Sequence, residues 1–413
     1  MSRPHHHWSW DFVTRLRAAV AAFPLSITLL LTLSASQPAL AQNFKVIHYF
    51  SGGEDGAFPQ AGLTMDSAGN LYGTTSAGYG DCGTFGCGTV FELKHTESGW
   101  VFNTIYTFRG GSDGAQPTSR VKIGPDGSLY GTTYYGGGEC IWYYGGSGGC
   151  GTVYKLTPSD NGWTETVLYS FGTDRLTDGA NPYSPVTLDQ HGDLYGTTHY
   201  GSQIAYQLSQ TESGWREAVI ARLAGYPLAG MTFDKAGNLY GVSPELFQLQ
   251  PTSSGWQYHR LAGFWGDALG APILDGDGNV YFATDGCGPY QICGGMIFRA
   301  TPMPNGQWTL SELYTFPAQG YGPSDSLVMD SAGNLYGTTW NAGAYGHGSV
   351  FKLAPPYGSG ATYTSLHDFT GQADGGFLYG NVIFGPDGNL YGTTFSDSAK
   401  NSCACGLVFE ITP

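Results

Sequence analysis

Charged residues are scarce in this sequence. They make up 12% of the 413 residues, about half of the roughly 25% found in an average soluble domain. Disordered proteins are rich in charge and poor in aromatic residues, whereas 15% of this chain is aromatic, so a disordered protein is excluded. Basic residues are the scarcer kind, 17 against 32 acidic residues, and the net charge of −15 excludes an electrostatic binder of nucleic acid. The chain has 65 glycines, but they do not recur at every third position, which excludes collagen.

Long apolar runs are missing apart from one near the N-terminus, so the sequence is not that of a multi-span membrane protein. Arg15 and Arg17 precede the apolar residues 18–33, and this run is shorter than the roughly 20 residues of a spanning helix. Ala39-Leu40-Ala41 then forms a small-x-small cleavage site. We therefore interpret residues 1–41 as a signal peptide. We expect the mature chain, residues 42–413, to be one domain without a membrane span, located in the periplasm, at the cell surface or in the medium.

A repeated phrase organises the rest of the chain. The residues from Asp66 to Thr75 read DSAGNLYGTT. Related phrases surround Tyr130, Tyr195, Tyr240, Tyr281, Tyr336 and Tyr391. In the first unit, period-2 patterning predicts four strands, at residues 63–66, 70–75, 89–93 and 100–108. Four antiparallel strands per unit, with 41 to 65 residues between repeat tyrosines, predict an all-β fold, a seven-bladed β-propeller.

The two ends of the chain predict how the ring closes. The last unit stops after its third strand, while residues 44–50 resemble the fourth strand that ends at Phe369. We therefore expect the N-terminal strand to complete blade seven, which leaves no exposed sheet edge.

The repeat has a structural interpretation of its own. In the Asp-x-x-Gly-Asn turn the aspartate can accept backbone N–H bonds, and the glycine supplies a positive φ. We expect the glycine after each repeat tyrosine to make room for a ring from the neighbouring sheet, and we assign the repeat tyrosines to the core between blades.

These motifs are similar to the GloVer-type (Gloeo/Verruco) tandem repeat, a family of bacterial secreted or surface proteins. The likeness is good at residues 69–93, 127–156, 333–353 and 388–411, where Gly-Asn-Leu-Tyr-Gly-Thr-Thr or a close variant precedes a Gly-rich stretch and a run such as Gly-Thr-Val-Phe. The resemblance implies a propeller-like repeat outside the cytoplasm, and it carries no catalytic residues over to this chain.

Strand parity predicts where ligands bind. In a four-stranded blade, the loop between the second and third strands emerges on the same face as the connection that enters the next blade. We call this the loop face, and its loops are long and aromatic. Because binding residues concentrate in loops on rigid scaffolds, its aromatic residues are our predicted ligand-binding set. The set comprises Tyr79, Phe85, Tyr134, Tyr135, Trp142, Tyr143, Tyr144, Tyr200, Tyr290, Trp340 and Tyr345.

All eight cysteines fall in these loops, two to a loop. An even count in an exported chain, with no Cys-x-x-Cys pair, predicts four local disulfides and not a zinc site. The predicted pairs are Cys82 with Cys87, Cys140 with Cys150, Cys287 with Cys293, and Cys403 with Cys405. The bridges either stiffen the loops for recognition or protect them from proteolysis.

Four connections into a blade contain Asp-Gly, at Asp55, Asp113, Asp178 and Asp374. Their carboxylates could approach the mouth of the central channel and hold a calcium ion. The alternative, which we favour, is that Asp-Gly makes the turn from rim to axis.

Signatures of catalysis are few. The mature sequence contains no Gly-x-Ser-x-Gly elbow, phosphate loop or His-Glu-x-x-His motif, and parity places only His199 and His347 among its histidines on the loop face. We therefore expect a non-catalytic binding or scaffold module for a glycan, another extracellular polymer or a surface protein, without a cofactor. The alternatives are an extracellular propeller hydrolase or lyase that uses loop-face carboxylates, with or without calcium, and a structural protein of the cell envelope.

Overall fold

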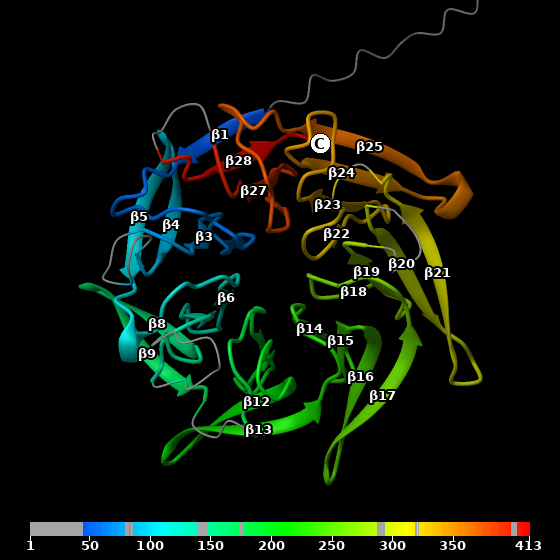
Figure 1. Cartoon of the computed structure of the whole chain (residues 1–413), viewed down its shortest axis with the longest axis horizontal. Helices are drawn as coiled ribbons and strands as arrows, with labels where there is room; N and C mark the ends of the chain where they lie inside the picture. Colours follow the sequence, from blue (N-terminus) through cyan, green and yellow to red (C-terminus); the bar gives the residue numbers. More distant parts are fainter. Residues whose placement is uncertain are drawn as a thin grey trace, which may run out of the picture. The chain divides into compact units, whose positions relative to one another are not determined.

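The computed structural model describes residues 44–78, 82, 86–138, 140, 148–172, 177–286, 294–318, 320, 322–397 and 403–413. The predicted signal peptide and its cleavage site lie outside these residues. Within them, seven four-stranded antiparallel sheets follow one another around a ring, which confirms the seven-bladed propeller (Figure 1). The helical turns of the described residues are two short 3-10 turns, η1 (Gly111–Asp113) and η2 (Gly358–Gly360). No helix in this part of the chain is long and apolar enough to cross a membrane.

The strands of blades one to six follow chain order from the axis outward, and in blade seven the outermost strand is β1. Blade one comprises β2 (Thr64–Met65), β3 (Leu71–Thr75), β4 (Thr89–Thr96) and β5 (Gly99–Thr107). Blade two comprises β6 (Lys122–Ile123), β7 (Leu129–Thr133), β8 (Thr152–Ser159) and β9 (Gly162–Ser170). Blade three comprises β10 (Thr187–Leu188), β11 (Leu194–Thr197), β12 (Ile204–Thr211) and β13 (Gly214–Arg222). Blade four comprises β14 (Met231–Phe233), β15 (Leu239–Ser243), β16 (Glu245–Thr252) and β17 (Gly255–Gly263). Blade five comprises β18 (Ile273–Leu274), β19 (Val280–Thr284), β20 (Met296–Pro302) and β21 (Trp308–Thr315). Blade six comprises β22 (Val328–Met329), β23 (Leu335–Thr339), β24 (Ser349–Ala354) and β25 (Thr362–Asp368). Blade seven comprises β26 (Ile383–Phe384), β27 (Leu390–Thr394), β28 (Leu407–Ile411) and β1 (Phe44–Tyr49).

The ring closes as the sequence predicts. Strand β1, the first of the described chain, pairs antiparallel with β28, the last, from Phe44 opposite Ile411 to Tyr49 opposite Leu407. The inner strands are shorter than predicted. Strand β4 is longer because it continues to a two-residue turn between Thr96 and Gly99, and β5 has the predicted length but starts one residue earlier. Chain ends that share one sheet hold the first and last repeats together (Figure 1).

The repeated turn is held by its aspartate. Asp66 Oδ1 accepts backbone N–H bonds from Ala68 and Asn70 at 2.9 and 2.8 Å, and Gly69 has a φ of 85°. The hydroxyl of Tyr72 donates to Asp66 Oδ2 at 3.2 Å, so the same carboxylate also orients the repeat tyrosine.

The glycine after the repeat tyrosine does make room for a ring, but the expected source of that ring was wrong. A Cβ on Gly73 would lie 2.4 Å from Cζ of Phe91. Phe91 is paired with Gly73 on β4 of the same blade, so the ring comes from the adjacent strand and not from the neighbouring sheet.

The two threonines of the repeat join strands and blades. Thr75 shares a hydrogen bond of 2.8 Å with Thr89 on the next strand of its own blade. The hydroxyl before it points to the next blade, where Thr74 Oγ1 donates to the carbonyl of Ser119 at 3.1 Å. The same bond between neighbouring blades recurs from Thr132 to Ser184, Thr197 to Ala229, Thr338 to Gly380 and Thr393 to Ala61.

The core lies between blades. The ring of Tyr72 packs 6.3 Å from Trp163 of the next blade. Equivalent contacts join Tyr391 to Trp100 at 5.8 Å, Tyr195 to Trp256 at 5.6 Å and Tyr240 to Trp308 at 6.0 Å. This confirms the assignment of the repeat tyrosines to the core, since each is buried against its neighbour's outer strand.

Candidate functional site

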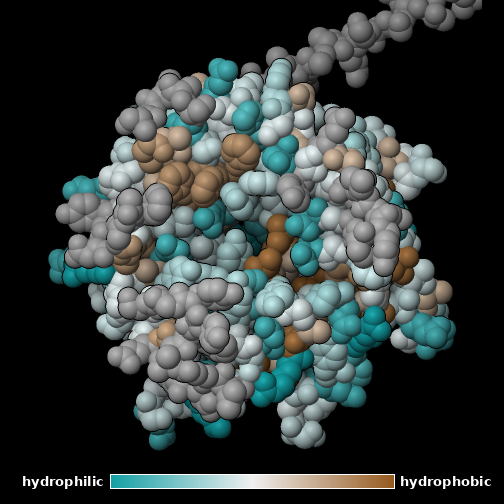
Figure 2. Space-filling view, viewed as in Figure 1, coloured by the Kyte–Doolittle hydropathy of each residue, from teal (hydrophilic) through white to brown (hydrophobic). Residues whose placement is uncertain are grey.

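Short bridges confirm which connections share the loop face. Residues that enter a blade pair with residues that follow its second strand: Ala57 with Ala77, Ala115 with Tyr135, Ala180 with Tyr200, and Gly376 with Ser396. The turns of the repeat lie at the other ends of the strands. Figure 2 shows a hollow at the centre of the ring, with apolar and polar surface on its walls.

The predicted aromatic residues divide into two groups. Tyr134, Tyr135, Tyr200, Trp340 and Tyr345 are described by the structure, and Tyr345 is 62% exposed. Tyr79, Phe85, Trp142, Tyr143, Tyr144 and Tyr290 lie outside the described residues.

The first aromatic cluster spans blades two to four and comprises Tyr134, Tyr135, Tyr183, His199, Tyr200 and Tyr226. Ring centroids lie 4.7 Å apart for Tyr134 and Tyr135, 6.0 Å for Tyr134 and Tyr183, and 4.2 Å for His199 and Tyr200. Tyr226 is the most open member, with 65% of its surface exposed. Burial lowers the pKa of His199, so this imidazole is neutral near pH 7 and behaves as one more ring of the cluster.

The second aromatic cluster spans blades six, seven and one and comprises Phe58, Trp340, His347, Phe377, Tyr379 and Phe395. Phe395 lies 5.0 Å from both Phe58 and Tyr379, measured between ring centroids. Trp340 lies 6.0 Å from Tyr379. These rings are half-buried, so each keeps part of its surface available.

The two clusters interact electrostatically across the ring. Burial, together with the nearby Tyr379 hydroxyl and Asp325 carboxylate, raises the pKa of Tyr183 to about 12. Tyr183 belongs to the first cluster and Tyr379 to the second. The Tyr183 hydroxyl of blade three therefore lies within electrostatic range of a tyrosine of blade seven and a carboxylate of blade six.

A group of three polar residues, the axial polar group, contains this carboxylate. Arg120 Nη1 donates to Asn381 Oδ1 at 3.2 Å, and the backbone N–H of Asn381 donates to Asp325 Oδ2 at 3.0 Å. Ser326 donates to Asp325 Oδ1 from its backbone N–H at 2.6 Å and from its hydroxyl at 3.1 Å. Burial raises the pKa of Asp325, and Arg120 opposes that effect. Blades two, six and seven are thus cross-linked around the axis.

Beside this group lies an axial cavity of about 150 Å³. Its polar lining is Arg120, Lys122, Thr187 and Thr232, and its apolar lining is Val121, Pro185, Val186, Met231 and Ala271. The cavity is formed by the entries and innermost strands of blades two to five.

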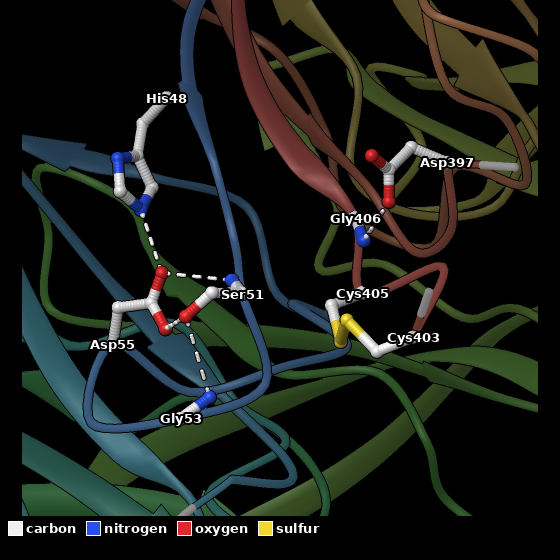
Figure 3. The surroundings of a disulfide bond; sticks show 8 residues. All are labelled: His48, Ser51, Gly53, Asp55, Asp397, Cys403, Cys405 and Gly406. Atoms are coloured by element: carbon white, nitrogen blue, oxygen red, sulfur yellow. Dashed lines mark hydrogen bonds and ion pairs between the residues drawn. A yellow bond between two sulfur atoms is a disulfide. The ribbon is translucent and has the colours of Figure 1, made fainter. Parts of the chain in front are cut away.

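Three of the four predicted disulfides are confirmed, and the pair Cys287 and Cys293 lies outside the described residues. Cα atoms are 5.0 Å apart in Cys82–Cys87, 5.1 Å in Cys140–Cys150 and 5.2 Å in Cys403–Cys405, within the usual range for a bridge. Figure 3 shows the last of these beside Asp397, whose Oδ1 accepts the backbone N–H of Gly406 at 2.9 Å.

Each described disulfide holds the entry to the next blade. The carbonyl of Cys405 accepts the backbone N–H of Phe58 at 2.9 Å, that of Cys87 accepts from Gln116 at 2.7 Å, and that of Cys150 accepts from Asn181 at 2.6 Å. These hydrogen bonds hold Phe58, Gln116 and Asn181 at φ values of 57°, 54° and 54°. A positive φ is a strained conformation for residues other than glycine.

In blade six a histidine takes the place of the bridge. The carbonyl of His347 accepts the backbone N–H of Phe377 at 2.7 Å, and Phe377 has a φ of 58°. A Cβ on Gly371 would lie 2.6 Å from the His347 ring, just as one on Gly172 would lie 2.5 Å from Cys150 Sγ.

The four Asp-Gly aspartates each hold their own turn. Asp55 accepts from His48 Nε2 at 3.2 Å and from the backbone N–H of Ser51 at 2.8 Å (Figure 3). Asp374 repeats this with His367 and Thr370 at 3.2 and 2.9 Å. Asp113 and Asp178 accept instead from the hydroxyls of Tyr106 and Tyr169.

The hydrogen bonds of these aspartates fit the interpretation that Asp-Gly makes the turn from rim to axis. Burial alone would raise the pKa of Asp55, but the bonds from His48 and Ser51 outweigh it and lower that pKa. In the described part of the chain no three His, Cys, Asp or Glu side chains are grouped to hold a metal ion.

Two half-buried acid groups were not expected from the sequence. Burial, and then the charge of Asp113, raises the pKa of Glu165 to about 7. Glu217 has the same pKa for the same reason, with Asp178 as its neighbour. Each acts on the hydroxyl of a fully buried tyrosine, Glu165 on Tyr154 and Glu217 on Tyr206. The other blades carry phenylalanine at the tyrosine position, as at Phe91 and Phe351.

The axial residues were missed from the sequence because, in the connections into each blade, only the Asp-Gly aspartates were considered. A signal was present in the connections into each blade. The eleventh residue before the repeat tyrosine is small in six blades, as Ala61, Ser119, Ser184, Ala229, Gly270 or Gly380, and is Asp325 in the other. The next column holds Arg120 and Asn381, and the preceding one holds Tyr183 and Tyr379.

Together these features define a seven-bladed propeller with a disulfide-tied aromatic loop face and a polar axis. The chain belongs to the Gloeobacter/Verrucomicrobia repeat family, whose pattern matches residues 35–246 and 228–413. This confirms the resemblance seen in the repeat phrases.

Solved structures of other proteins share the fold at low identity. A fungal alcohol oxidase of the AA5 family, in complex with copper, is similar with a TM-score of 0.57 and 13% identity, over 90% of this chain and 76% of that one. A putative 6-phosphogluconolactonase from Bacteroides uniformis ATCC 8492 is similar with a TM-score of 0.50 and 13% identity, over 81% of this chain and 89% of that one. At this identity the likeness shows the fold alone. No curated protein matches the chain.

Proposed function

We propose that this protein is a non-catalytic module that binds a glycan on its loop face, outside the cytoplasm. The observation that carries the proposal is the presence of two aromatic clusters on the loop face, one in blades two to four and one in blades six, seven and one, around a polar axis. Half-exposed tyrosine and tryptophan rings present an apolar face for stacking on a sugar ring and a polar tip for its hydroxyls. Disulfides, which form and persist in oxidising compartments, support the location.

The rigidity of the loop face supports recognition over mere protection from proteolysis. Phe58 and Phe377 belong to the second aromatic cluster, and both have a positive φ fixed by a carbonyl of the preceding loop. Rings held in place before the ligand arrives lose little conformational entropy on binding. The bridges thus set the positions of the rings that would contact a ligand.

A catalytic role has less support. The carboxylates named for the alternative hydrolase or lyase include Asp113 and Asp178, and each accepts a hydrogen bond from a tyrosine of the preceding outer strand. These hydrogen bonds hold the Asp113 and Asp178 carboxylates within the turn that enters the next blade. No described residue favours the third alternative, a structural envelope protein, over the binding module.

The experiment is a binding and turnover screen of residues 42–413 with the disulfides intact. Neutral and acidic oligosaccharides are titrated with and without calcium, followed by tryptophan fluorescence and calorimetry, and products are sought after long incubation. We expect saturable binding without turnover. Tyr379→Ala and Trp340→Ala weaken it about ten-fold or more. The control Met303→Ala, a 44% exposed apolar residue on the opposite face, leaves it unchanged.

Two outcomes contradict the proposal. Turnover of any sugar that disappears in Asp113→Asn and Asp178→Asn proteins of native fold supports the enzyme. An absence of saturable binding across the screen removes the glycan from consideration and favours a protein partner.

A further inference from the structure

Two cations lie side by side at the axis of a protein that has few of them. Lys122 is the first residue of β6, Arg120 lies two residues before it, and both line the axial cavity. The chain has only 17 basic residues and a net charge of −15. The solubility of the protein does not explain why two of its few cations lie together at its centre.

The charges of the site do not balance within the described residues. Arg120 bonds to the neutral Asn381 and faces the carboxylate of Asp325. That carboxylate already accepts three hydrogen bonds, from Ser326 and Asn381. Lys122 forms no ion pair with any described residue, and burial, then Arg120, lowers its pKa. Asp325 thus acts on Arg120, whereas no described carboxylate is paired with Lys122.

The cavity is large enough for an anion. Its volume of about 150 Å³ is well above what one water molecule needs. The cavity therefore has room for a carboxylate, sulfate or phosphate group. The hydroxyls of Thr187 and Thr232 add polar lining, while Pro185, Val186 and Met231 make the rest of the wall apolar.

The aromatic rings lie where the remainder of such a ligand would be. Tyr183 precedes the lining residue Pro185 by two positions, and Tyr379 precedes Asn381 by two. Because the chain runs inward from the loop face at these points, both tyrosines are nearer to that face than the cavity is. A sugar ring in contact with these tyrosines would therefore lie on the loop-face side of the cavity.

We propose that the axial cavity binds the oxyanion of an acidic sugar, held by Lys122 and Arg120, while Tyr183 and Tyr379 contact the ring of that sugar. This inference rests on the proposed glycan-binding function and names its ligand class. The preferred ligand carries a single or terminal acidic residue, since a dense polyanion is repelled by the net negative charge of the protein.

The test compares matched ligands on residues 42–413. One trisaccharide ends in glucuronate and the other is identical but ends in glucose, and sodium glucuronate and sodium phosphate serve as small-anion probes. We expect the acidic trisaccharide to bind at least about ten-fold more tightly than the neutral one, as a charge-assisted contact predicts. Added salt weakens the acidic ligand only.

The variants are chosen so that misfolding is not mistaken for loss of the site. Lys122→Gln removes one charge and is expected to abolish the preference for the acidic ligand while leaving neutral binding within about two-fold. Arg120→Gln adds a second reading, with circular dichroism as the check on its fold because Arg120 also bonds to Asn381. The control Lys235→Gln removes the same charge from an exposed turn of the opposite face and changes nothing.

Each result decides between the two proposals. Equal affinity for both trisaccharides, or an acidic preference that survives Lys122→Gln, overturns the anion site and leaves the glycan function standing. Binding of glucuronate or phosphate that depends on Lys122, without binding of any oligosaccharide, supports the anion site and contradicts the glycan function. Phosphate that competes as well as glucuronate shows that the site selects the oxyanion and not the sugar acid.

Discussion

The two half-buried glutamates make the stability of the propeller depend on pH. Glu165 and Glu217 are half-buried on β9 and β13 and have pKa values raised from 4.5 to about 7, first by burial and then by Asp113 and Asp178. Replacing both with glutamine keeps the shape of the protonated side chain and removes the titration. The perturbation is therefore Glu165→Gln with Glu217→Gln, compared with wild type from pH 5 to pH 8.

The sign of the pH dependence of the free energy of unfolding follows from whether the folded or the unfolded chain holds the proton. Between pH 4.5 and about 7 the unfolded chain has released the two protons that the folded chain keeps, so the contribution of these groups to stability falls as pH rises through this window and is constant above it. At about 1.36 kcal/mol per pKa unit, each glutamate would account for at most about 3.4 kcal/mol. Because the side chains are partly exposed, solvent screening reduces this to about 1 to 2 kcal/mol each.

The assay is urea-induced unfolding, followed by tryptophan fluorescence at each pH. We expect the double variant to match wild type near pH 5 and to be more stable by about 2 to 4 kcal/mol at pH 8. His199 and His367, whose pKa values are lowered chiefly by burial, contribute a slope of opposite sign, but they are present in both proteins and cancel in the difference. The exposed control Glu97→Gln shows no pH-dependent difference. A difference between double variant and wild type that stays constant from pH 5 to 8 would refute the reasoning.

Two further predictions concern the framework. Thr393→Val removes the 3.0 Å bond to the Ala61 carbonyl that joins blade seven to blade one, and we expect it to lower the free energy of unfolding by about 1 to 2 kcal/mol. Thr364→Val, on an exposed position of β25, serves as its control in thermal unfolding, and an equal effect of both would contradict the role of the inter-blade bond. Replacing Cys140 and Cys150 together with serine opens a bridge of sequence separation 10, and chain entropy predicts a loss of about 2 to 3 kcal/mol. The same variant should weaken glycan binding by more than its stability loss explains at a temperature where it is fully folded; unchanged affinity would favour protection from proteolysis as the purpose of the bridge.

Most of the fold could be predicted because the residues of each repeat specify the strands and turns of one blade. The turn at Asp66 needs an acceptor and a positive φ, and the sequence supplies Asp and Gly at those positions in most units. The missing fourth strand of the last unit predicted the pairing of β1 with β28. The strand that supplies the ring over Gly73 was assigned wrongly, because a close approach in sequence pattern does not say which neighbour makes it.

The candidate site was predicted only in part. Loop-face aromatics such as Tyr134, Tyr200 and Trp340 were named, and the structure places each in a cluster of rings. Their partners Tyr183 and Tyr379 were not named, because they enter from the connections between blades. Whether these tyrosines lie near the other rings depends on the distance between blades three and seven across the ring. No local sequence pattern determines that distance.

By itself, the sequence determined the blade. Periodicity, turn chemistry and the spacing of glycine, threonine and tyrosine are local constraints, and they are satisfied within one repeat or between consecutive repeats. Only the tertiary structure decided what stands at the axis, because Arg120, Asp325 and Asn381 come from blades two, six and seven and meet solely through closure of the ring. The charge and burial of these three residues depend on the closed ring, since each of the three blades contributes one residue whose hydrogen-bond partners lie on the other blades.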